Sequence, residues 1–284
     1  MQVVRTVAEL RELRSQVTSP VGLVPTMGAL HDGHVSLVQQ AREQCATVIA
    51  SLFVNPTQFG PDEDFERYPR DEQRDLALFE QAGTDIVFMP SVEEMYLEGD
   101  VTVVTLTGVS ERLEGGHRPG HFDGVATVVT KLFNQVQPDR AYFGQKDAQQ
   151  LLMIRTFTRD LHLPIEIVGC RTVREPDGLA LSSRNVYLSD QERTQALALS
   201  RGLKRACAAY AAGLRDAGQI RALVHDQVDA QPLADIDYIS LAHPGTLVEL
   251  AGDIDESAEG TALLSLAVRV GTTRLIDNVV LGES

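Results

Sequence analysis

The first half of the chain alternates between two kinds of hydrophobic pattern. Short apolar runs rich in β-branched residues, such as TVIASLFV at 47–54, are typical of buried parallel strands. The stretches between these runs carry apolar residues at helical spacing. We therefore predict strands over 21–24, 47–54, 85–89, 140–143 and 165–168, and helices over about 32–44, 71–82, 125–135 and 148–160. This alternation predicts an α/β fold with a doubly wound parallel sheet.

Several element boundaries carry their own signals. Thr6 and Glu9 have the spacing of a capping box, so the chain is expected to open on a helix. Gly83 is expected to end the helix that precedes it. Residues 101–106 (VTVVTL) are a further candidate strand. The segment 114–124 (EGGHRPGHFDG) has four glycines and a proline, which predicts a mobile loop.

The character of the sequence changes after residue 172. A polar loop over 173–185 is followed by a second capping box, Ser189 and Glu192, which predicts a long helix to about residue 212. A further helix and the strands 236–242, 262–270 and 275–281 predict a second, smaller α+β domain. We therefore expect one domain over 1–172 and another over 173–284.

Composition narrows the classes of function. The 284 residues have a formal net charge of −15, which disfavours a surface that binds the phosphate backbone of a nucleic acid. No apolar run reaches membrane-spanning length, and the first residues lack the apolar block of a signal peptide, so we expect a cytoplasmic protein with no membrane partner. The three cysteines lie far apart without a CxxC pair, which indicates neither a disulfide framework nor a zinc site.

Residues 20–42 (PVGLVPTMGALHDGHVSLVQQAR) are the most informative stretch. A strand here leads through a glycine-containing turn into a helix, and free backbone N–H groups at a helix N-terminus favour an anion such as phosphate. His31 and His34, three residues apart, can lie on the same side of the opening turn. The alternatives are an ordinary pair of surface histidines or a zinc site, although zinc would require a third ligand.

Three more loops carry candidate chemistry. Gln58 follows an Asn-Pro turn and offers an amide suited to a hydroxyl or carboxylate group, although such a turn by itself only ends a strand. Lys146 can neutralise a phosphate and Asp147 can accept from a ribose hydroxyl, but a surface Lys-Asp pair is a common alternative. Residues 181–185 (LSSRN) combine two hydroxyls with a cation that can bind phosphate, or form a serine-rich linker.

Taken together, these stretches resemble one family. PTMGALHDGH, LFVNPTQF, YPR, RPGHFDGV, YFGQKDAQQL, TVREPDGLALSSRN and TRLIDNV occur in the order seen in pantothenate synthetases (pantoate–β-alanine ligases), which belong to the HxGH nucleotidyltransferase superfamily. The family usually has MSSRN where this chain has Leu181 in place of Met, an exchange of similar volume. The resemblance covers nearly the whole chain and implies a Rossmann-like first domain and a smaller C-terminal domain that covers the active site.

The resemblance implies an activity and a set of site residues. The reaction is the ATP-dependent ligation of (R)-pantoate and β-alanine through pantoyl adenylate, with release of AMP and pyrophosphate and with Mg²⁺ accompanying ATP. Gln58 and Gln150 are expected to bind pantoate and β-alanine, and a homodimer is implied. The residues expected at ATP are Met27, Gly28, Ala29, Leu30, His31, Asp32, Gly33, His34, Gly144, Gln145, Lys146, Asp147, Val173, Leu181, Ser182, Ser183 and Arg184.

Within that set, the resemblance implies a catalytic role for His31, His34, Lys146, Ser182, Ser183 and Arg184. Asp75 is a candidate carboxylate near a metal, and Arg118 is a candidate phosphate or flap contact. Two other functions remain open from the sequence. The chain could adenylylate a phosphorylated small molecule, or it could be a nucleotide-binding regulator without catalysis, although such a regulator would be expected to have lost one of His34, Lys146 or Arg184.

Overall fold

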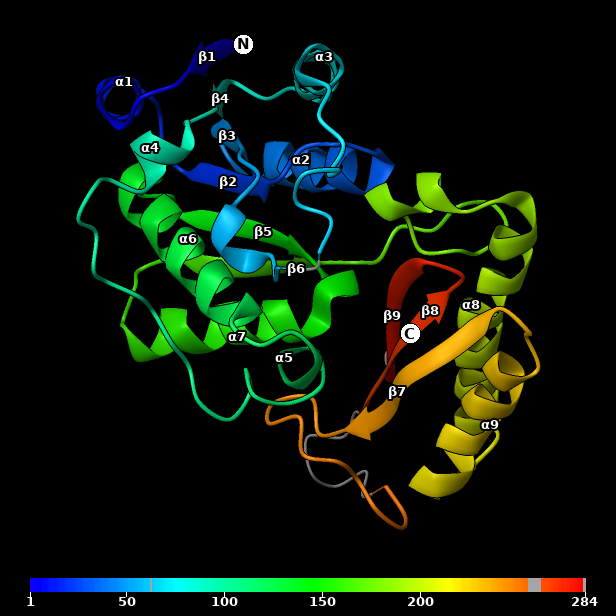
Figure 1. Ribbon diagram of the computed structural model, residues 1–284. Helices are drawn as coiled ribbons and strands as arrows, with labels where there is room; N and C mark the ends of the chain where they lie inside the picture. Colours follow the sequence, from blue (N-terminus) through cyan, green and yellow to red (C-terminus); the bar gives the residue numbers. More distant parts are fainter. Residues whose placement is uncertain (62, 255–261, 283–284) are drawn as a thin grey trace. The chain divides into compact units, whose positions relative to one another are not determined.

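The structure is a computed structural model that describes residues 1–61, 63–254 and 262–282. These residues form two compact units (Figure 1). The first unit contains Met1–Gln145 and Gln149–Arg171, and the second contains Lys146–Ala148 together with the described residues from Thr172 onward.

The first unit is built on a six-stranded sheet in which every strand pair is parallel. The strand order is β1-β4-β3-β2-β5-β6. The sequence therefore runs outward from β2 in one direction and resumes at β5 in the other, as expected for a doubly wound sheet. The strands are β1 (Gln2–Val4), β2 (Val21–Thr26), β3 (Thr47–Leu52), β4 (Ile86–Phe88), β5 (Arg140–Gly144) and β6 (Glu166–Cys170).

Helices cover both faces of this sheet. One face bears α2 and α3, and the other bears α1, α6 and α7 (Figure 1). The helices of the first unit are α1 (Val7–Arg14), α2 (Asp32–Gln44), α3 (Glu72–Ala82), α4 (Val92–Met95), α5 (Glu114–His117), α6 (His121–Val136) and α7 (Ala148–Asp160). Two short 3₁₀ helices, Pro56–Gln58 and Gln145–Asp147, follow β3 and β5.

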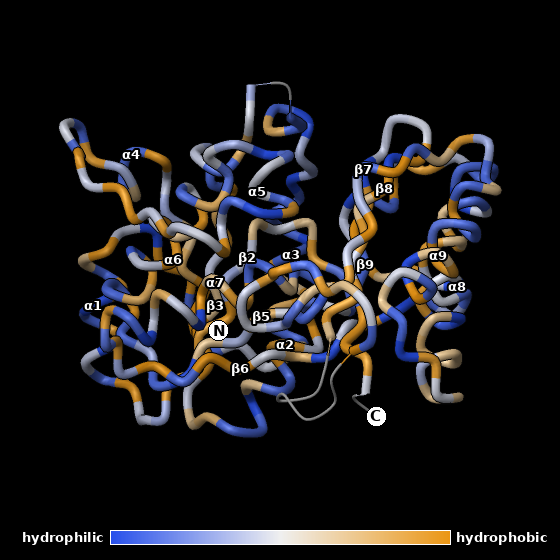
Figure 2. The backbone as a smooth tube through the Cα atoms, turned by 90° about the horizontal axis from the view of Figure 1, so that it is seen from below, coloured by the Kyte–Doolittle hydropathy of each residue, from blue (hydrophilic) through white to orange (hydrophobic). Residues whose placement is uncertain are grey.

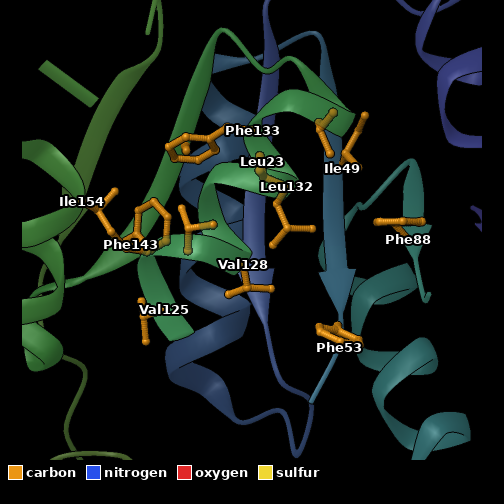
Figure 3. Close-up of a cluster of buried hydrophobic side chains, with 14 of the residues drawn as sticks. Leu23, Ile49, Phe53, Phe88, Val125, Val128, Leu132, Phe133, Phe143 and Ile154 are labelled. Atoms are coloured by element: carbon orange, nitrogen blue, oxygen red, sulfur yellow. The ribbon is translucent and has the colours of Figure 1, made fainter. Parts of the chain in front are cut away.

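Alternation along the strands divides the apolar residues between two cores. Leu23 of β2 and Ile49 of β3 belong to the cluster packed by α6, whereas the neighbouring Val24 and Ala50 belong to the cluster packed by α2 and α3. Figure 3 shows Leu23 of β2, Ile49 of β3 and Leu132 of α6, all members of the first of these clusters. Because both faces are buried, the strands appear in the sequence as continuous apolar runs.

The second unit combines two helices with a three-stranded antiparallel sheet in the order β7-β8-β9. The elements are α8 (Asp190–Ala211), α9 (Ala217–Asp229), β7 (Ala234–Ala242), β8 (Ala262–Val270) and β9 (Thr273–Leu281), with a 3₁₀ helix over Ser183–Tyr187. In Figure 2, α8 and α9 alternate between hydrophilic and hydrophobic colours, as expected for helices with one buried face. Their apolar residues form a core with the sheet.

Most boundary predictions are confirmed. Both predicted capping boxes form, at Thr6–Glu9 and at Ser189–Glu192, and Gly83 ends α3 in the left-handed conformation at φ +91°. The expectation that the chain opens on a helix is wrong, because β1 precedes α1 and pairs with β4. Its three residues are too few for a pattern to be recognised.

Two other predictions need correction. Residues 101–106 form no strand. They nevertheless alternate as a strand would, because Val104 and Leu106 pack on the core while Val101 is 91% exposed. The glycine-rich segment 114–124 is not a simple loop, because it contains α5 and the first turn of α6. Among the described residues, no helix combines the length and apolar character needed to cross a bilayer.

Candidate active site

The candidate site begins where the strand order of the first unit reverses. β2 pairs with β3 on one side and with β5 on the other, so the loops that leave β2 and β5 flank the switch point of the sheet. Open α/β sheets bind their ligands at this position. The stretch Met27–His34 follows β2 directly, while Gly144 ends β5 and Gln145 follows it. The fold therefore brings these two predicted loops to the same edge of the sheet.

The loop after β2 folds around a buried carboxylate. Gly28 and Ala29 adopt left-handed conformations, with φ of +84° and +51°. This turn directs two successive backbone N–H groups at Asp75 on α3: Ala29 N donates to Oδ2 at 2.9 Å and Leu30 N donates to Oδ1 at 2.8 Å. Consecutive N–H groups in such a turn form an anion-binding nest. Here the anion in the nest is supplied by the chain itself.

Asp75 is buried and is held by the backbone of this loop; its predicted place near a metal stays a prediction. The residue is 1% exposed, and burial raises the pKa of its carboxyl, while the hydrogen bonds from Leu30 and Ala29 act in the opposite direction. Both oxygens already accept from the backbone. Among the described residues, no group of three or more His, Cys, Asp or Glu is arranged to hold a metal ion.

His31 and His34 form a capping box at the start of α2. The Nδ1 atom of His31 accepts from Gly33 N at 3.2 Å, and the Nδ1 atom of His34 accepts from His31 N at 3.3 Å. A ring nitrogen that accepts from an N–H group carries no proton, so we assign both rings as neutral tautomers with the proton on Nε2. The ring centroids lie 4.2 Å apart. The pair therefore places two imidazole Nε2–H groups near the switch point.

These contacts change how the loop can bind an anion. The prediction relied on free backbone N–H groups at the helix N-terminus, but those of Ala29, Leu30, His31 and Gly33 have partners within the first unit. The N–H of His34 also donates to His31 O at 2.8 Å. Asp32, in the first turn of α2, is exposed. The backbone N–H groups at the start of this loop are therefore largely engaged by the first unit itself.

Gln58 is held in a network of polar groups after β3. Asn55 donates to Gln58 Oε1 at 3.1 Å, and Gln58 Nε2 lies 3.1 Å from the sulfur of Met27. Tyr96 donates to Asn55 Oδ1 at 2.7 Å, which fixes the amide of Asn55 in turn. Gln58 is 9% exposed. The sequence analysis overlooked Asn55 and Tyr96 as supports for Gln58, although Asn55 belongs to the same motif.

A second network joins the start of α6 to the turn that carries Gln58. Arg118 forms a two-pronged ion pair with Glu63, with distances of 2.7 and 2.6 Å, and contacts His121 Nε2 at 3.0 Å. His121 Nδ1 lies 2.8 Å from Gln58 O. Burial and the nearby Arg118 cation lower the pKa of His121 to about 4, so the ring is neutral at pH 7. Arg118 therefore serves here as a structural partner of Glu63 and His121.

Two adjacent glutamines near the start of α7 have different surroundings. Gln149 is buried and anchors the segment before α6, because it accepts from Glu114 N and donates to Val109 O and Arg112 O. The predicted substrate residue Gln150 is only partly buried. Gln149 was not singled out by the sequence analysis, since nothing in the pattern distinguishes it from Gln150.

The remaining predicted residues belong to the second unit. Lys146 and Asp147 lie in the 3₁₀ helix after β5, and the carbonyl of Lys146 accepts from Asn278 on β9 at 2.8 Å. Ser182 caps the 3₁₀ helix Ser183–Tyr187 by accepting from Arg184 N. Leu181 N donates to Val173 O at 3.0 Å, which closes the hairpin that leads into this turn.

The turn in the second unit is supported by ion pairs. Glu175 accepts from Asn185 Nδ2 at 2.8 Å and from Arg193 on α8 at 2.6 Å. Arg193 also contacts Asp177 at 2.7 Å. The hydrogen bond from Arg193 lowers the pKa of Glu175. A neighbouring pair, Arg174 with Asp277, has two contacts of 2.6 and 2.9 Å.

Comparison with known proteins identifies the family. The family model described as pantoate-beta-alanine ligase matches residues 2–280. The chain belongs to this family. A pantothenate synthetase of Chloroflexus aurantiacus is 58% identical over 281 residues, which cover 99% of this chain and 98% of that protein. The chain is therefore an enzyme of the ligase class that joins pantoate to β-alanine in pantothenate biosynthesis.

Solved structures agree with this assignment. The pantothenate synthetase of Thermus thermophilus is 49% identical and has a TM-score of 0.92, with 98% of this chain and 99% of that chain covered. A pantoate-beta-alanine ligase of Francisella tularensis, complexed with beta-gamma ATP and beta-alanine, is 30% identical and has a TM-score of 0.80, with 100% and 99% covered. The predicted Rossmann-like sheet with a smaller second domain is confirmed.

Proposed function

We propose that this ligase works in two steps through pantoyl adenylate, within the biosynthesis of pantothenate and coenzyme A. A carboxylate oxygen of (R)-pantoate attacks the α-phosphorus of ATP, and the bond to the β-phosphate breaks to release pyrophosphate. The amine of β-alanine then attacks the acyl carbon, the bond to AMP breaks, and the amine nitrogen loses a proton. The observation that supports this proposal is the His31–His34 pair at the switch point of the sheet, where the Nδ1 atoms of both rings accept from backbone N–H groups.

The first step needs charge neutralisation and fixed geometry, because a carboxylate must approach a polyanion. His31 and His34 would donate to the phosphates as charge builds up at phosphorus. Lys146, Ser182, Ser183 and Arg184 would stabilise the charge that moves onto pyrophosphate, Arg184 through its planar fork. The backbone of Gly144 and Val173 would contact adenine, and Asp147 the ribose. In this proposal, residues 1–172 bind nucleotide and pantoate, and residues 173–284 supply the SSRN side chains.

Mg²⁺ is proposed to enter as part of the substrate, Mg-ATP. This ion is usually held by phosphate oxygens, water and one or two carboxylates instead of a cage made by protein alone. Bound in that way, it would withdraw charge from the phosphates and so assist the same groups.

Pantoate is proposed to bind at Gln58 and Gln150, and β-alanine to contact Gln58. The amide of Gln58 is oriented by Asn55 on one side and Met27 on the other, so its direction is set before a substrate arrives. A group fixed in this way loses little conformational entropy on binding. The neighbouring network of Arg118, Glu63 and His121 holds the backbone of the same turn.

The decisive experiment measures pyrophosphate release from Mg-ATP with pantoate alone and then with β-alanine added. We expect one equivalent of pyrophosphate per active site with pantoate alone. Addition of β-alanine should convert this burst into steady turnover with formation of AMP. If the folded protein releases no pyrophosphate in response to pantoate, the adenylate route is wrong. Pyrophosphate release that requires β-alanine from the start would also contradict an adenylate formed before the amine binds.

We further propose that the protein is a cytoplasmic homodimer. The strongly exposed valines of the segment after α4, Val101 at 91% and Val103 at 63%, offer apolar surface for self-association. Sedimentation velocity should give twice the mass of the chain, 31.0 kDa, and fractionated cells should retain the protein in the cytoplasm. A species of 31.0 kDa at micromolar concentration would contradict the dimer.

A further inference from the structure

The nest formed by the loop after β2 is filled by a carboxylate of the chain itself. We propose that Asp75 is a positioning residue, an internal anion that holds Gly28–Leu30 in place and thereby aims the Nε2–H groups of His31 and His34 at the substrate. This inference rests on the catalytic role proposed above for the two histidines. It gives Asp75 a task different from that of a metal ligand.

The backbone of the loop needs such a partner. Ala29 lies at φ +51°, a region that side chains other than glycine occupy at a cost, and it follows Gly28 at φ +84°. Two backbone N–H groups that point the same way also repel each other. A carboxylate that accepts from both N–H groups offsets this repulsion, because hydrogen bonds to an ionised acceptor are among the strongest in proteins.

The loop transmits the position of Asp75 directly to the histidines. Leu30, which donates to Asp75 Oδ1, is 1% exposed and packs in the core with α2 and α3. The next residue is His31, the N-cap of α2, whose ring and that of His34 are fixed by the capping box. No flexible residue separates the braced amide from the first imidazole. A shift of the nest therefore becomes a shift of both donors.

The internal carboxylate also decides which groups meet the phosphates. An empty nest would attract a phosphate oxygen, as helix N-termini and nests generally do. Asp75 occupies the N–H groups of Ala29 and Leu30 and adds a buried negative charge beside them. Phosphate is thus disfavoured in the nest, and in this proposal it meets the imidazoles of His31 and His34 instead.

The space around the carboxylate of Asp75 is narrow, so only a small anion could replace this group if it were removed. A Cβ atom added at Gly28 would lie 2.9 Å from Asp75 Oδ2 and 2.8 Å from Leu52 Cδ1. The carboxylate is therefore enclosed by the loop and by β3, and its removal leaves a space of about its own size. Formate is a carboxylate small enough to enter such a space.

The experiment compares Asp75→Ala and Asp75→Asn with the exposed control Asp71→Asn, which removes a charge from the N-cap of the same helix. We expect Asp75→Ala to lower turnover about 10²-fold, the typical cost of a displacement near 1 Å. Formate at tens of millimolar should restore turnover at least tenfold, and an equal concentration of chloride should not. Asp71→Asn should stay within twofold of the parent protein.

Asp75→Asn keeps the shape of the side chain and covers the case in which Asp75→Ala fails to fold. Its amide NH₂ would face a backbone N–H, so turnover should fall while the Mg²⁺ concentration for half-maximal rate stays unchanged. In this proposal Asp75 acts through His31. The loss of turnover in the double variant Asp75→Asn/His31→Asn should therefore be much smaller than the product of the losses in the two single variants. Nitrogen NMR of the two imidazoles should show their Nε2–H signals shifted in Asp75→Asn.

Three results would overturn the proposal. A raised Mg²⁺ requirement without formate rescue would make Asp75 a metal ligand. Turnover equal to that of the parent protein in Asp75→Asn would show that the contact between Asp75 and the loop does not contribute to catalysis. Unchanged imidazole signals in a destabilised Asp75→Asn would leave Asp75 a purely structural role. The NMR measurement needs no turnover, so it still tests the brace if the parent protein releases no pyrophosphate with pantoate and the adenylate route itself fails.

Discussion

The two loops that carry the candidate catalytic side chains are held in different ways. Met27–His34 in the first unit is fixed through its backbone, by left-handed residues, a buried carboxylate and a capping box. The turn at Ser182–Asn185 in the second unit is fixed through side chains, chiefly the half-buried cluster of Glu175, Asp177 and Arg193. Both arrangements keep polar groups in place, but the two loops should respond differently to mutation, salt and pH.

The difference shows what each loop can tolerate. A backbone-braced loop depends on a few atoms that have no substitute, so small changes there should be severe. An ion-pair cluster with 22–34% of its side-chain surface exposed shares its energy among several contacts and with water. Such pairs contribute little individually and are screened by salt. Four changes, taken from the largest expected effect to the smallest, test this contrast.

The largest effect is expected from His31→Asn. Asparagine is a good N-cap whose side-chain oxygen can accept from Gly33 N, as the Nδ1 atom of His31 does, but it lacks the Nε2–H donor. Turnover should fall by roughly 10²–10⁴, the range for loss of one positioned donor, while the melting temperature changes little. His34→Ala should lose turnover in the same range. His31→Asn within threefold of the parent protein would reject the donor role.

Gly28→Ala should come next. At φ +84° its methyl group would meet Asp75 Oδ2 at 2.9 Å, so the strain of a left-handed alanine adds to a steric conflict with the brace. We expect a loss of about 2–4 kcal/mol in the free energy of unfolding and at least 10² in turnover. Gly99→Ala is the matched control, since φ is +88° and nothing lies within 4 Å of the added atom. Gly99→Ala should lower the free energy of unfolding by about 1 kcal/mol and leave turnover unchanged.

Arg193→Lys should have a moderate effect. Lysine keeps the charge but lacks the fork that contacts Glu175 and Asp177 together. We expect turnover to fall several-fold and the free energy of unfolding by about 1 kcal/mol. Added salt at about 0.5 M should reproduce part of this loss in the parent protein. Arg221→Lys, which changes a surface pair with Glu249 in the same unit, is the control and should have little effect on turnover.

The smallest effect at pH 7 is expected from the fourth change, which acts through the pH dependence of stability. His121 has a pKa of about 4 in the folded protein against 6.5 for the unperturbed group, so between these values only the unfolded chain takes up a proton. The free energy of unfolding should therefore decrease as the pH falls from 6.5 towards 4, by up to about 3 kcal/mol. His121→Gln should remove this dependence, and the exposed control His225→Gln should not. Urea unfolding midpoints between about pH 4 and 7.5 measure it.

The second unit should titrate in a different window. The pKa of Glu175 is lowered by its contact with Arg193, so the contribution of this carboxylate is present above the ordinary value of 4.5 and is lost below it. Near pH 5.5 the network around His121 should already be weakened while that around Glu175 is intact. Loss of both networks in the same pH range would contradict the contrast between the two units.

The strand and helix order could be predicted because these elements rest on local patterns. Buried parallel strands produce continuous apolar runs, and capping boxes such as Thr6–Glu9 depend on residues three apart. Residues 101–106 show the limit of this reasoning. Their alternation correctly indicates one face on the core, but a strand also needs a hydrogen-bonded neighbour, and the pattern says nothing about whether one exists.

Glycine misled the prediction for 114–124. Gly124 lies in the first turns of α6, where a Cβ atom would come within 2.4 Å of Thr57 O. This glycine allows a helix to touch the turn that carries Gln58, so it serves close packing instead of flexibility. Sequence alone does not separate these two uses of glycine.

The residues of the candidate site could be proposed from motifs, but the contacts that hold them could not. Motif resemblance placed His31, His34 and Gln58 in one functional set. The partner of the first loop, Asp75, lies 46 residues from Ala29 and on another helix, so no spacing rule could connect them. The same holds for Tyr96, which supports Asn55 from 41 residues away. These contacts can be identified only from the three-dimensional structure, in which Asp75 of α3 lies against the loop after β2 and Tyr96, just after α4, lies against Asn55.

The amides of Ala29 and Leu30 have a consequence for the motions of the protein. Loop amides usually exchange their hydrogens with water within seconds, because they open without disturbing the rest of the molecule. These two donate to a buried carboxylate that is itself anchored on α3, so exposing them requires the loop and the helix to separate. Exchange into deuterated water should therefore be slow at both positions, and by this measure the loop belongs to the rigid core of the first unit.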